Sequence, residues 1–218
     1  MKEFSVTMAL VDYIPVIFFG MASIILMRDL YNKMSKGAFA LFSAGAINIF
    51  SAGALKAFYK LLYAAGICDF APLNEMFFPV QSIGFLLAGV GMLAMIFRQQ
   101  GNGIVALSVA PPLWKGTFLF VGIMVAGLGC MDAGLMILSN RLKKRSAIPL
   151  FVLSFICSMG MGYLSSQNFA QASMNWIAEG VNIVGQGCLL IGVWMLHKAG
   201  LAEYKIPRKR IGESKYSL

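Results

Sequence analysis

The chain has 218 residues and a net charge of +9; 59% of its residues are hydrophobic and 12% are charged. Soluble domains carry about 25% charged and about 45–50% apolar residues, so this composition excludes a water-soluble globular domain. The basic residues stand in short clusters between apolar runs, which is typical of loops beside a membrane rather than of a nucleic-acid-binding face.

Long apolar runs divide the chain. A helix needs about 20 apolar residues to cross the hydrocarbon core of a bilayer. Six runs come close to that length, at residues 8–27, 38–63, 76–97, 117–138, 148–165 and 176–197. We therefore predict an all-α, polytopic integral membrane helix bundle over residues 1–197. Residues 198–218 are basic, and we expect them to form a cytoplasmic tail.

The first two runs carry charged side chains near the same end of the predicted bundle. Asp12 lies three residues before Pro15, which predicts a kink in the first helix. Lys56 and Lys60 are four residues apart, so they share one helix face and repel each other unless acids or an anion lie near. Either they line an outward-facing polar vestibule with Asp12, or they snorkel to the lipid headgroups. Asn48 lies deeper in the second run.

The third run contains the amide Gln81, and an ambiguous segment follows that run. Residues 101–115, GNGIVALSVAPPLWK, are apolar, but a helix over 103–114 would be about 18 Å long against about 30 Å of hydrocarbon. The segment is a short seventh span, a re-entrant piece or a surface segment. A six-span chain would place the basic loop 28–36 outside, against the positive-inside bias. We therefore predict six long spans plus a short seventh, with the amino terminus outside.

The fourth run contains a single acid, Asp132. Small residues precede it, Gly127, Gly129 and Cys130, and such residues allow neighbouring helices to approach closely. An ionisable side chain inside a bilayer is costly and is often functional. Asp132 is therefore a candidate proton-coupling site, and a helix-packing acid near the interface is the alternative.

The last run carries a polar stripe. Glu179, Asn182 and Gln186 follow spacings of three and four residues, so they lie on one face of the predicted helix. Amides at this depth can bind a polar solute in place of water, or they can tie helices together. A carboxylate is a poor helix tie, so Glu179 favours a solute or proton role.

A faint internal repeat relates the third run to the last. At one constant offset, four residues of the first half meet residues of the same or similar type in the second: Asn74, Gln81, Gly84 and Gly91 meet Asn175, Asn182, Gly185 and Gly192. Chance similarity in a biased composition is the alternative. A true repeat predicts two parallel halves of three spans, 8–97 and 117–197, joined by the linker 98–116. Parallel repeats are one known transporter plan.

Several motifs that would indicate enzymes or cofactors are missing from the sequence. The single histidine, His197, ends the last run, no lysine stands in the middle of that run to hold retinal, and neither C-x-x-C nor H-E-x-x-H occurs. We expect no cofactor, no metal and no catalytic activity.

These patterns together predict a small membrane transporter or channel for a small polar or charged solute. The residues that we expect to bind the solute are Glu179, Asn182, Gln186, Gln81, Asp12, Lys56 and Asn48. The alternative is a non-catalytic seven-helix receptor or accessory subunit that binds a ligand or a partner protein. We expect a multi-pass protein of the cell inner membrane, in contact with the lipid bilayer, the solute, and a partner protein or a second copy of the chain.

Overall fold

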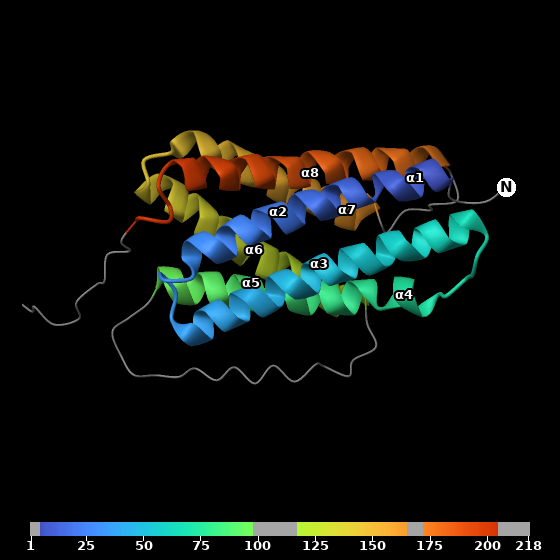
Figure 1. Ribbon diagram of the computed structural model, residues 1–218, viewed down its shortest axis with the longest axis horizontal. Coiled ribbons are helices and arrows are strands. Elements are labelled where there is room, and N and C mark those ends of the chain that lie inside the picture. The colour runs from blue at the N-terminus through green and yellow to red at the C-terminus, as the bar shows by residue number, and fades with distance from the viewer. Residues whose placement is uncertain (1–4, 98–116, 165–171, 205–218) are drawn as a thin grey trace, which may run out of the picture.

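A computed structural model describes residues 5–97, 117–164 and 172–204, and in this part of the chain all regular structure is helical (Figure 1). Five helical segments there are long and apolar enough to cross a membrane, and the segment Arg145–Met161 is a shorter apolar helix. The predicted all-α bundle is confirmed for these residues, and its long apolar helices are those of a multi-pass membrane protein. Residues 101–115, the predicted short seventh span, lie outside the described residues.

The described helices combine into six rods. The first rod joins α1 to α2 at Asp12, the third joins α4 to α5, and the short 3-10 helix η1 leads into α7. Their bounds are α1 Val6–Val11, α2 Tyr13–Leu30, α3 Lys36–Ala65, α4 Pro72–Glu75, α5 Phe77–Ile96, α6 Thr117–Arg141, η1 Arg145–Ala147, α7 Ile148–Leu164 and α8 Ala172–Lys198. Each predicted apolar run corresponds to one rod.

Local signals beyond hydrophobicity set some of these bounds. The Ser35 side chain accepts a hydrogen bond from the backbone N–H of Ala38 at 3.2 Å and caps α3, which begins at Lys36, two residues before the predicted start at 38. Gly66 ends the same helix with φ of 74°, a left-handed conformation that glycine adopts without strain. Capping therefore makes α3 longer than its apolar run.

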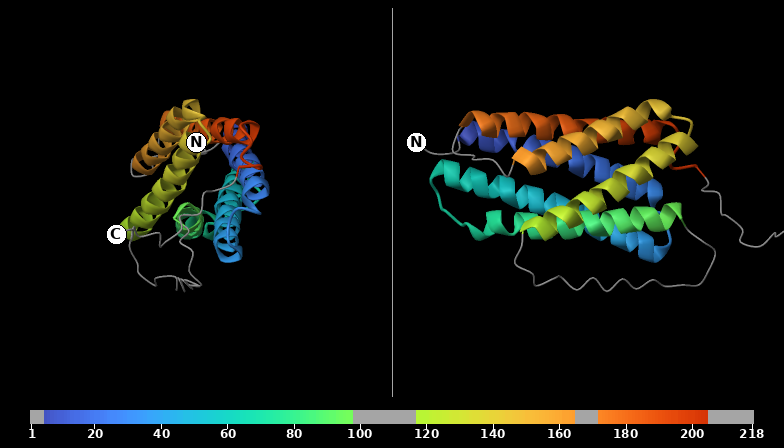
Figure 2. Two further views of the ribbon diagram at one scale, coloured as in Figure 1. Left: turned by 90° about the vertical axis from the view of Figure 1, so that its left-hand side faces the viewer. Right: turned by 180° about the vertical axis from the view of Figure 1, so that it is seen from behind.

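The six rods form a ring (Figure 2). Around it, α2 packs on α3, α3 on α5, α5 on α6, α6 on α7, α7 on α8, and α8 returns to α2. Most neighbours are antiparallel, but α5 runs parallel to α6 and α2 runs parallel to α8 (Figure 1). The ring consequently contains two sets of three consecutive rods that run in the same directions.

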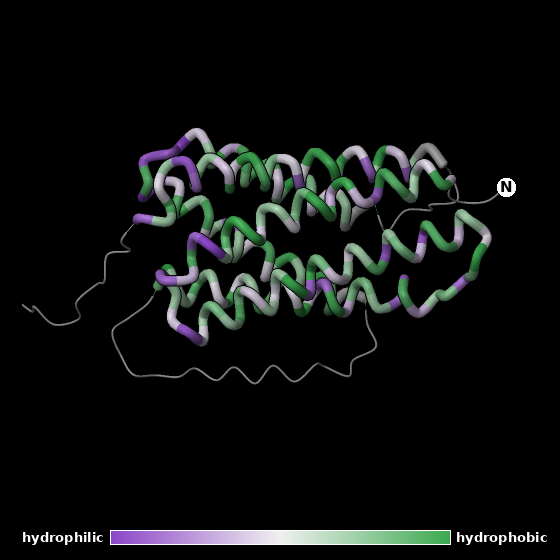
Figure 3. Tube along the Cα trace, viewed as in Figure 1, coloured by the Kyte–Doolittle hydropathy of each residue, from purple (hydrophilic) through white to green (hydrophobic). Residues whose placement is uncertain are grey.

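One end of the ring carries most of the described basic side chains, and we call it the basic end. It holds the turn after α2, the turn between α6 and α7, and the end of α8, at the left of Figure 1 and in purple in Figure 3. Its basic residues are Arg28, Lys33, Lys36, Arg141, Lys143, Lys144, Arg145 and Lys198. The amino terminus of α2 and the start of α8 lie at the opposite end.

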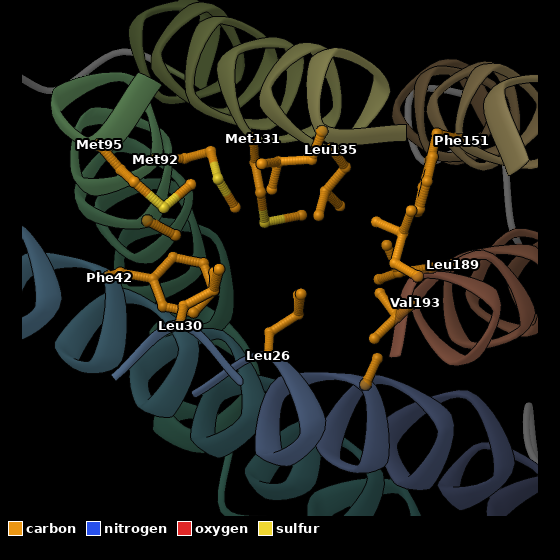
Figure 4. Packing of buried hydrophobic residues seen from close by; sticks show 14 of the residues in the cluster. Leu26, Leu30, Phe42, Met92, Met95, Met131, Leu135, Phe151, Leu189 and Val193 are labelled. Carbon is orange, nitrogen blue, oxygen red and sulfur yellow. The ribbon is translucent and has the colours of Figure 1, made fainter. Parts of the chain in front are cut away.

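Apolar side chains fill the half of the ring that adjoins the basic end. All six rods contribute to this core (Figure 4). Its members include Leu26, Leu30, Phe42, Met92, Met131, Leu135, Phe151, Leu189 and Val193. Large apolar side chains such as Ile24, Ile47 and Ile191 are exposed on the outside of the ring. Exposed apolar side chains of this kind are what lipid covers in a membrane protein.

Glycines bring α5 close to both of its neighbours. A Cβ atom at Gly91 would lie 2.7 Å from the Ala38 carbonyl oxygen of α3, and one at Gly89 would lie 3.1 Å from the Gly127 carbonyl carbon of α6. Gly192 of α8 has a similar role, because a Cβ there would lie 2.7 Å from the Phe151 ring of α7. Small residues let helices pack backbone to backbone in a membrane. Such close packing matters there because lipid is as apolar as the side chains, so burial of apolar surface does not drive helix association.

Candidate functional site

A partly enclosed cavity of about 130 Å³ lies inside the ring, lined by residues of all six rods, in the half of the ring away from the basic end. Its polar lining consists of Asp12, Lys56, Lys60, Gln81, Ser158, Glu179, Asn182 and Gln186. Its apolar lining includes Phe77, Phe78, Phe85, Met124, Leu128 and Met161. A second hollow of about 70 Å³ shares Gln81, Asn182 and Gln186 with it and reaches Pro15 and Ile49.

An ion pair joins the first two rods at this cavity. The Lys60 ammonium group pairs with the Asp12 carboxylate, and the two side chains are only 16% and 7% exposed. Asp12 stands at the junction of α1 and α2, and its backbone N–H is bonded to the preceding turn through the Met8 carbonyl at 3.0 Å. The pair therefore fixes α3 against the point at which the first rod changes from α1 to α2.

A second lysine faces the cavity without a carboxylate partner. The Lys56 ammonium nitrogen lies 3.9 Å from the centroid of the Phe77 ring, a cation–π contact that joins α3 to α5. No ion pair involving Lys56 occurs among the described residues. Lys56 is one helical turn from Lys60, so the two ammonium groups point to the same side of α3.

The polar stripe of α8 supplies the opposite wall. Glu179 is 5% exposed, and its carboxyl lies beside that of Asp12 and within electrostatic range of Lys56 and Lys60. In the described part of the chain, one carboxylate oxygen of Glu179 and the side-chain oxygen of Gln186 are buried and accept no hydrogen bond. A buried acceptor that receives no hydrogen bond costs about 1–3 kcal/mol, so both oxygens favour a guest that donates hydrogen bonds.

The structure brings together most of the residues that the sequence singled out. Six of them line the one cavity: Glu179, Asn182, Gln186, Gln81, Asp12 and Lys56. Asn48 lies on α3 but is not part of either lining. On α3 the cavity is lined by Gly53, Lys56, Ala57 and Lys60, and the same face includes Ile49 one turn earlier. Asn48 precedes Ile49 by one residue, so its side chain is rotated by about 100° from that face.

Asp132 lies apart from this cavity. It is 1% exposed on α6, and neither carboxylate oxygen has a hydrogen-bond partner among the described residues. Its neighbours along the helix, Met131 and Leu135, belong to the apolar core of the basic half. The structure therefore buries this acid deeply, at a site separate from the polar cavity.

Several lining residues were not predicted as binding residues. Lys60 was recognised as a neighbour of Lys56 on the same helix face, and its helical spacing would have been enough to include it. Ser158, Phe77 and Met161 stand within apolar runs, where nothing in the sequence separates a cavity wall from a packed or lipid-facing side chain.

A polar cluster at the basic end was also not predicted. The His197 Nδ1–H donates to the buried Asp29 carboxylate at 2.8 Å, and the Arg28 guanidinium lies 3.1 Å from His197 Nε2. Lys33 donates to the carbonyl oxygen of Ala202 at 2.6 Å. These contacts join α2 to the end of α8 on the far side of the apolar core from the cavity. The residues are some 170 positions apart, so sequence alone could not pair them.

Within residues 5–97, 117–164 and 172–204, no three or more His, Cys, Asp and Glu side chains gather as metal ligands. Cys130, Cys157 and Cys188 are free thiols on the helices. No family model, no curated protein and no solved structure matches the chain.

Proposed function

We propose that the chain is a small, non-catalytic membrane transporter or channel that accepts a small polar or charged solute in the cavity inside the ring of rods. The observation that carries this proposal is the convergence of polar side chains from separate rods on one hollow inside an otherwise apolar bundle. Ionisable groups at lipid depth are costly, and they normally face a binding site or a water-filled path.

The distribution of charge supports an orientation. We place the basic end in the cytoplasm because positively charged loops are retained on that side. The amino terminus and the cavity then face outward. The parallel directions of α5 and α6 (Figure 1) support the proposed count of seven spans.

The packing supports the proposed parallel repeat. Gly84 and Gly91 of α5 pack against α3, and the related Gly185 and Gly192 of α8 pack against α7. Gln81 and Asn182, which the same offset relates, both line the cavity. The two proposed halves, α2–α3–α5 and α6–α7–α8, therefore meet at the site, as in transporters whose solute binds between repeats.

Solute flux tests this proposal. Liposomes that contain only the purified chain should take up at least one member of a panel of amino acids, amines, short carboxylates and polyols. Glu179→Gln should abolish that flux while yield and thermal stability stay nearly unchanged, since the amide keeps the shape of the side chain and removes its charge.

Glu75→Gln is the matched control for this experiment. Glu75 is an exposed acid on α4, outside the cavity lining, so its neutralisation should leave flux at the wild-type rate. Normal flux in Glu179→Gln would remove Glu179 from the site. Absence of flux for every solute would remove the transport proposal itself.

The closed basic half favours a second candidate, a receptor or accessory subunit. The apolar core and the Asp29–His197 contact separate the cavity from the basic end, so a ligand can bind without a continuous path through the bundle. Such a protein would bind a ligand without flux and would co-purify with a partner protein or with a second copy of itself.

A further inference from the structure

The charged groups of the cavity are not all neutralised by one another. Lys60 is paired with Asp12, whereas Lys56 lies over the face of the Phe77 ring and forms no ion pair among the described residues. An aromatic face replaces only part of the hydration that a buried ammonium group loses. The α3 wall of the cavity therefore presents a positive charge that an anionic group of a guest would neutralise.

The α8 wall has the opposite requirement. Glu179 and Gln186 each present a buried oxygen that accepts no hydrogen bond among the described residues, and Glu179 is an acid that a neighbouring ammonium group would hold in its ionised form. These side chains lie on one face of α8, about 10 Å apart along the helix axis. They fit a guest with several N–H donors, and a guest ammonium group would in addition neutralise Glu179.

Ligands with one kind of charge fit this site poorly. A simple cation that binds Glu179 would meet the ammonium groups of Lys56 and Lys60, and a simple anion that binds Lys56 would meet the carboxylates of Glu179 and Asp12. A neutral polyol would bring no counter-ion to either wall. Close like charges in a site of low dielectric repel strongly, so only a ligand with separated charges satisfies both walls.

The size of the cavity restricts the ligand further. A protein cavity of about 150 Å³ holds benzene, which has six heavy atoms. A hollow of about 130 Å³ therefore suits a molecule of a similar, small number of heavy atoms. The adjoining hollow, which shares Asn182 and Gln186, allows modest extension of that molecule toward Pro15 and Phe19.

We propose that the ligand of this cavity is a small zwitterion of the amino-acid type, whose anionic group pairs with Lys56 and whose ammonium group binds Glu179. This inference rests on the proposed function, because it presumes that the cavity is a ligand site. It goes further because it specifies the chemical class of the solute. It also states which group of the solute binds the α3 wall and which binds the α8 wall.

A matched set of probes tests the class. Binding to the purified protein in detergent is measured by calorimetry and by thermal stabilisation with glycine, β-alanine, γ-aminobutyrate and taurine. The single-charge probes are propylamine and propionate, and the neutral probe is propionamide. We expect at least one zwitterion to bind at least tenfold more tightly than every single-charge or neutral probe.

Two variants test the assignment of the walls. Lys56→Met should weaken zwitterion binding at least tenfold and leave propylamine binding unchanged or stronger. Glu179→Gln should weaken zwitterion binding and leave propionate binding unchanged or stronger. Lys36→Met and Glu75→Gln are the matched controls, because both residues are exposed outside the cavity, and they should change none of these affinities. The probe series on the unchanged protein decides the class even where a variant does not fold.

The outcomes separate the two proposals. Equal binding of propylamine or propionate, a preference for propionamide, or failure of every zwitterion to bind would each overturn the zwitterion inference. An equal loss for all probes in both variants would overturn the assignment of the walls. Flux of a non-zwitterionic solute into liposomes would still uphold the transport proposal in any of these cases.

Discussion

Asp12 and Lys60 show how single residues hold the cavity in shape. Both side chains are largely buried, and each comes from a different rod. Burying two charges is costly, and their attraction offsets the cost only while both are present. The pair therefore sets the relative position of α2 and α3 and adds little to net stability. Single and double substitutions of the two residues should show this.

Removal of one partner should be far more harmful than removal of both. Lys60→Met leaves the Asp12 carboxylate buried without its ion-pair partner, and we expect a loss of about 3–5 kcal/mol in the free energy of unfolding. Adding Asp12→Asn to Lys60→Met removes the unpaired charge, so the double variant should recover much of that loss. Thermal or denaturant unfolding in detergent measures the four proteins of this cycle. Additive losses would show that the two residues are not coupled.

At the scale of the element, some glycines set the distance between helices, because they leave room for the backbone of a neighbouring helix. Gly91 of α5 faces the backbone of α3, whereas nothing lies within 4 Å of a Cβ built at Gly122 of α6. The same glycine-to-alanine change should therefore have opposite effects at the two positions.

Gly91→Ala should lower the stability of the bundle. The new Cβ would lie 2.7 Å from both the Ala38 carbonyl oxygen and the Phe42 backbone nitrogen, so α5 and α3 must separate, at about 1–3 kcal/mol. Gly122→Ala should leave stability unchanged or raise it by up to about 1 kcal/mol, because alanine favours the helix more than glycine does. Melting temperatures in detergent provide the measurement. Equal melting temperatures for the two variants would mean that the α3–α5 contact is not tight.

The helices are predictable from the sequence because each apolar run is long enough to cross a bilayer, and the helical period places Glu179, Asn182 and Gln186 on one face. Asn48 is a reasonable candidate because it is polar and central in its run, but the face of α3 that lines the cavity is one residue out of phase with it. Which rods are neighbours depends on contacts between distant segments, and no single-sequence pattern encodes those.

At the scale of the whole molecule, the ring is open at one end and closed at the other. The polar cavity occupies the half away from the basic end, and the apolar core fills the half beside it. The two sets of three rods meet where α2 runs beside α8 and where α5 runs beside α6. In the proposed transporter, separation of α2 from α8 at the basic end would release the solute on that side.

The Asp29–His197 contact is the place at which that separation can be blocked. The His197 ring nitrogen and the Asp29 carboxylate oxygen are 2.8 Å apart, so cysteines at these two positions are within reach of a short thiol-specific cross-linker. In a background that lacks the four native cysteines, we expect the cross-link to lower solute flux at least tenfold and a reducible linker to restore it on reduction. Ligand binding at the open end should persist, because the cavity lies on the other side of the core.

A cross-link within one half serves as the control for this experiment. Arg145 donates a hydrogen bond to Asn140 at 3.1 Å in the turn between α6 and α7, also at the basic end. Cysteines at these two positions join residues of the same three-rod set, so their cross-link should leave flux unchanged. If the cross-link between α2 and α8 also left flux unchanged, the solute would leave by a path that does not open this end of the ring, and the two halves would not move apart there during transport.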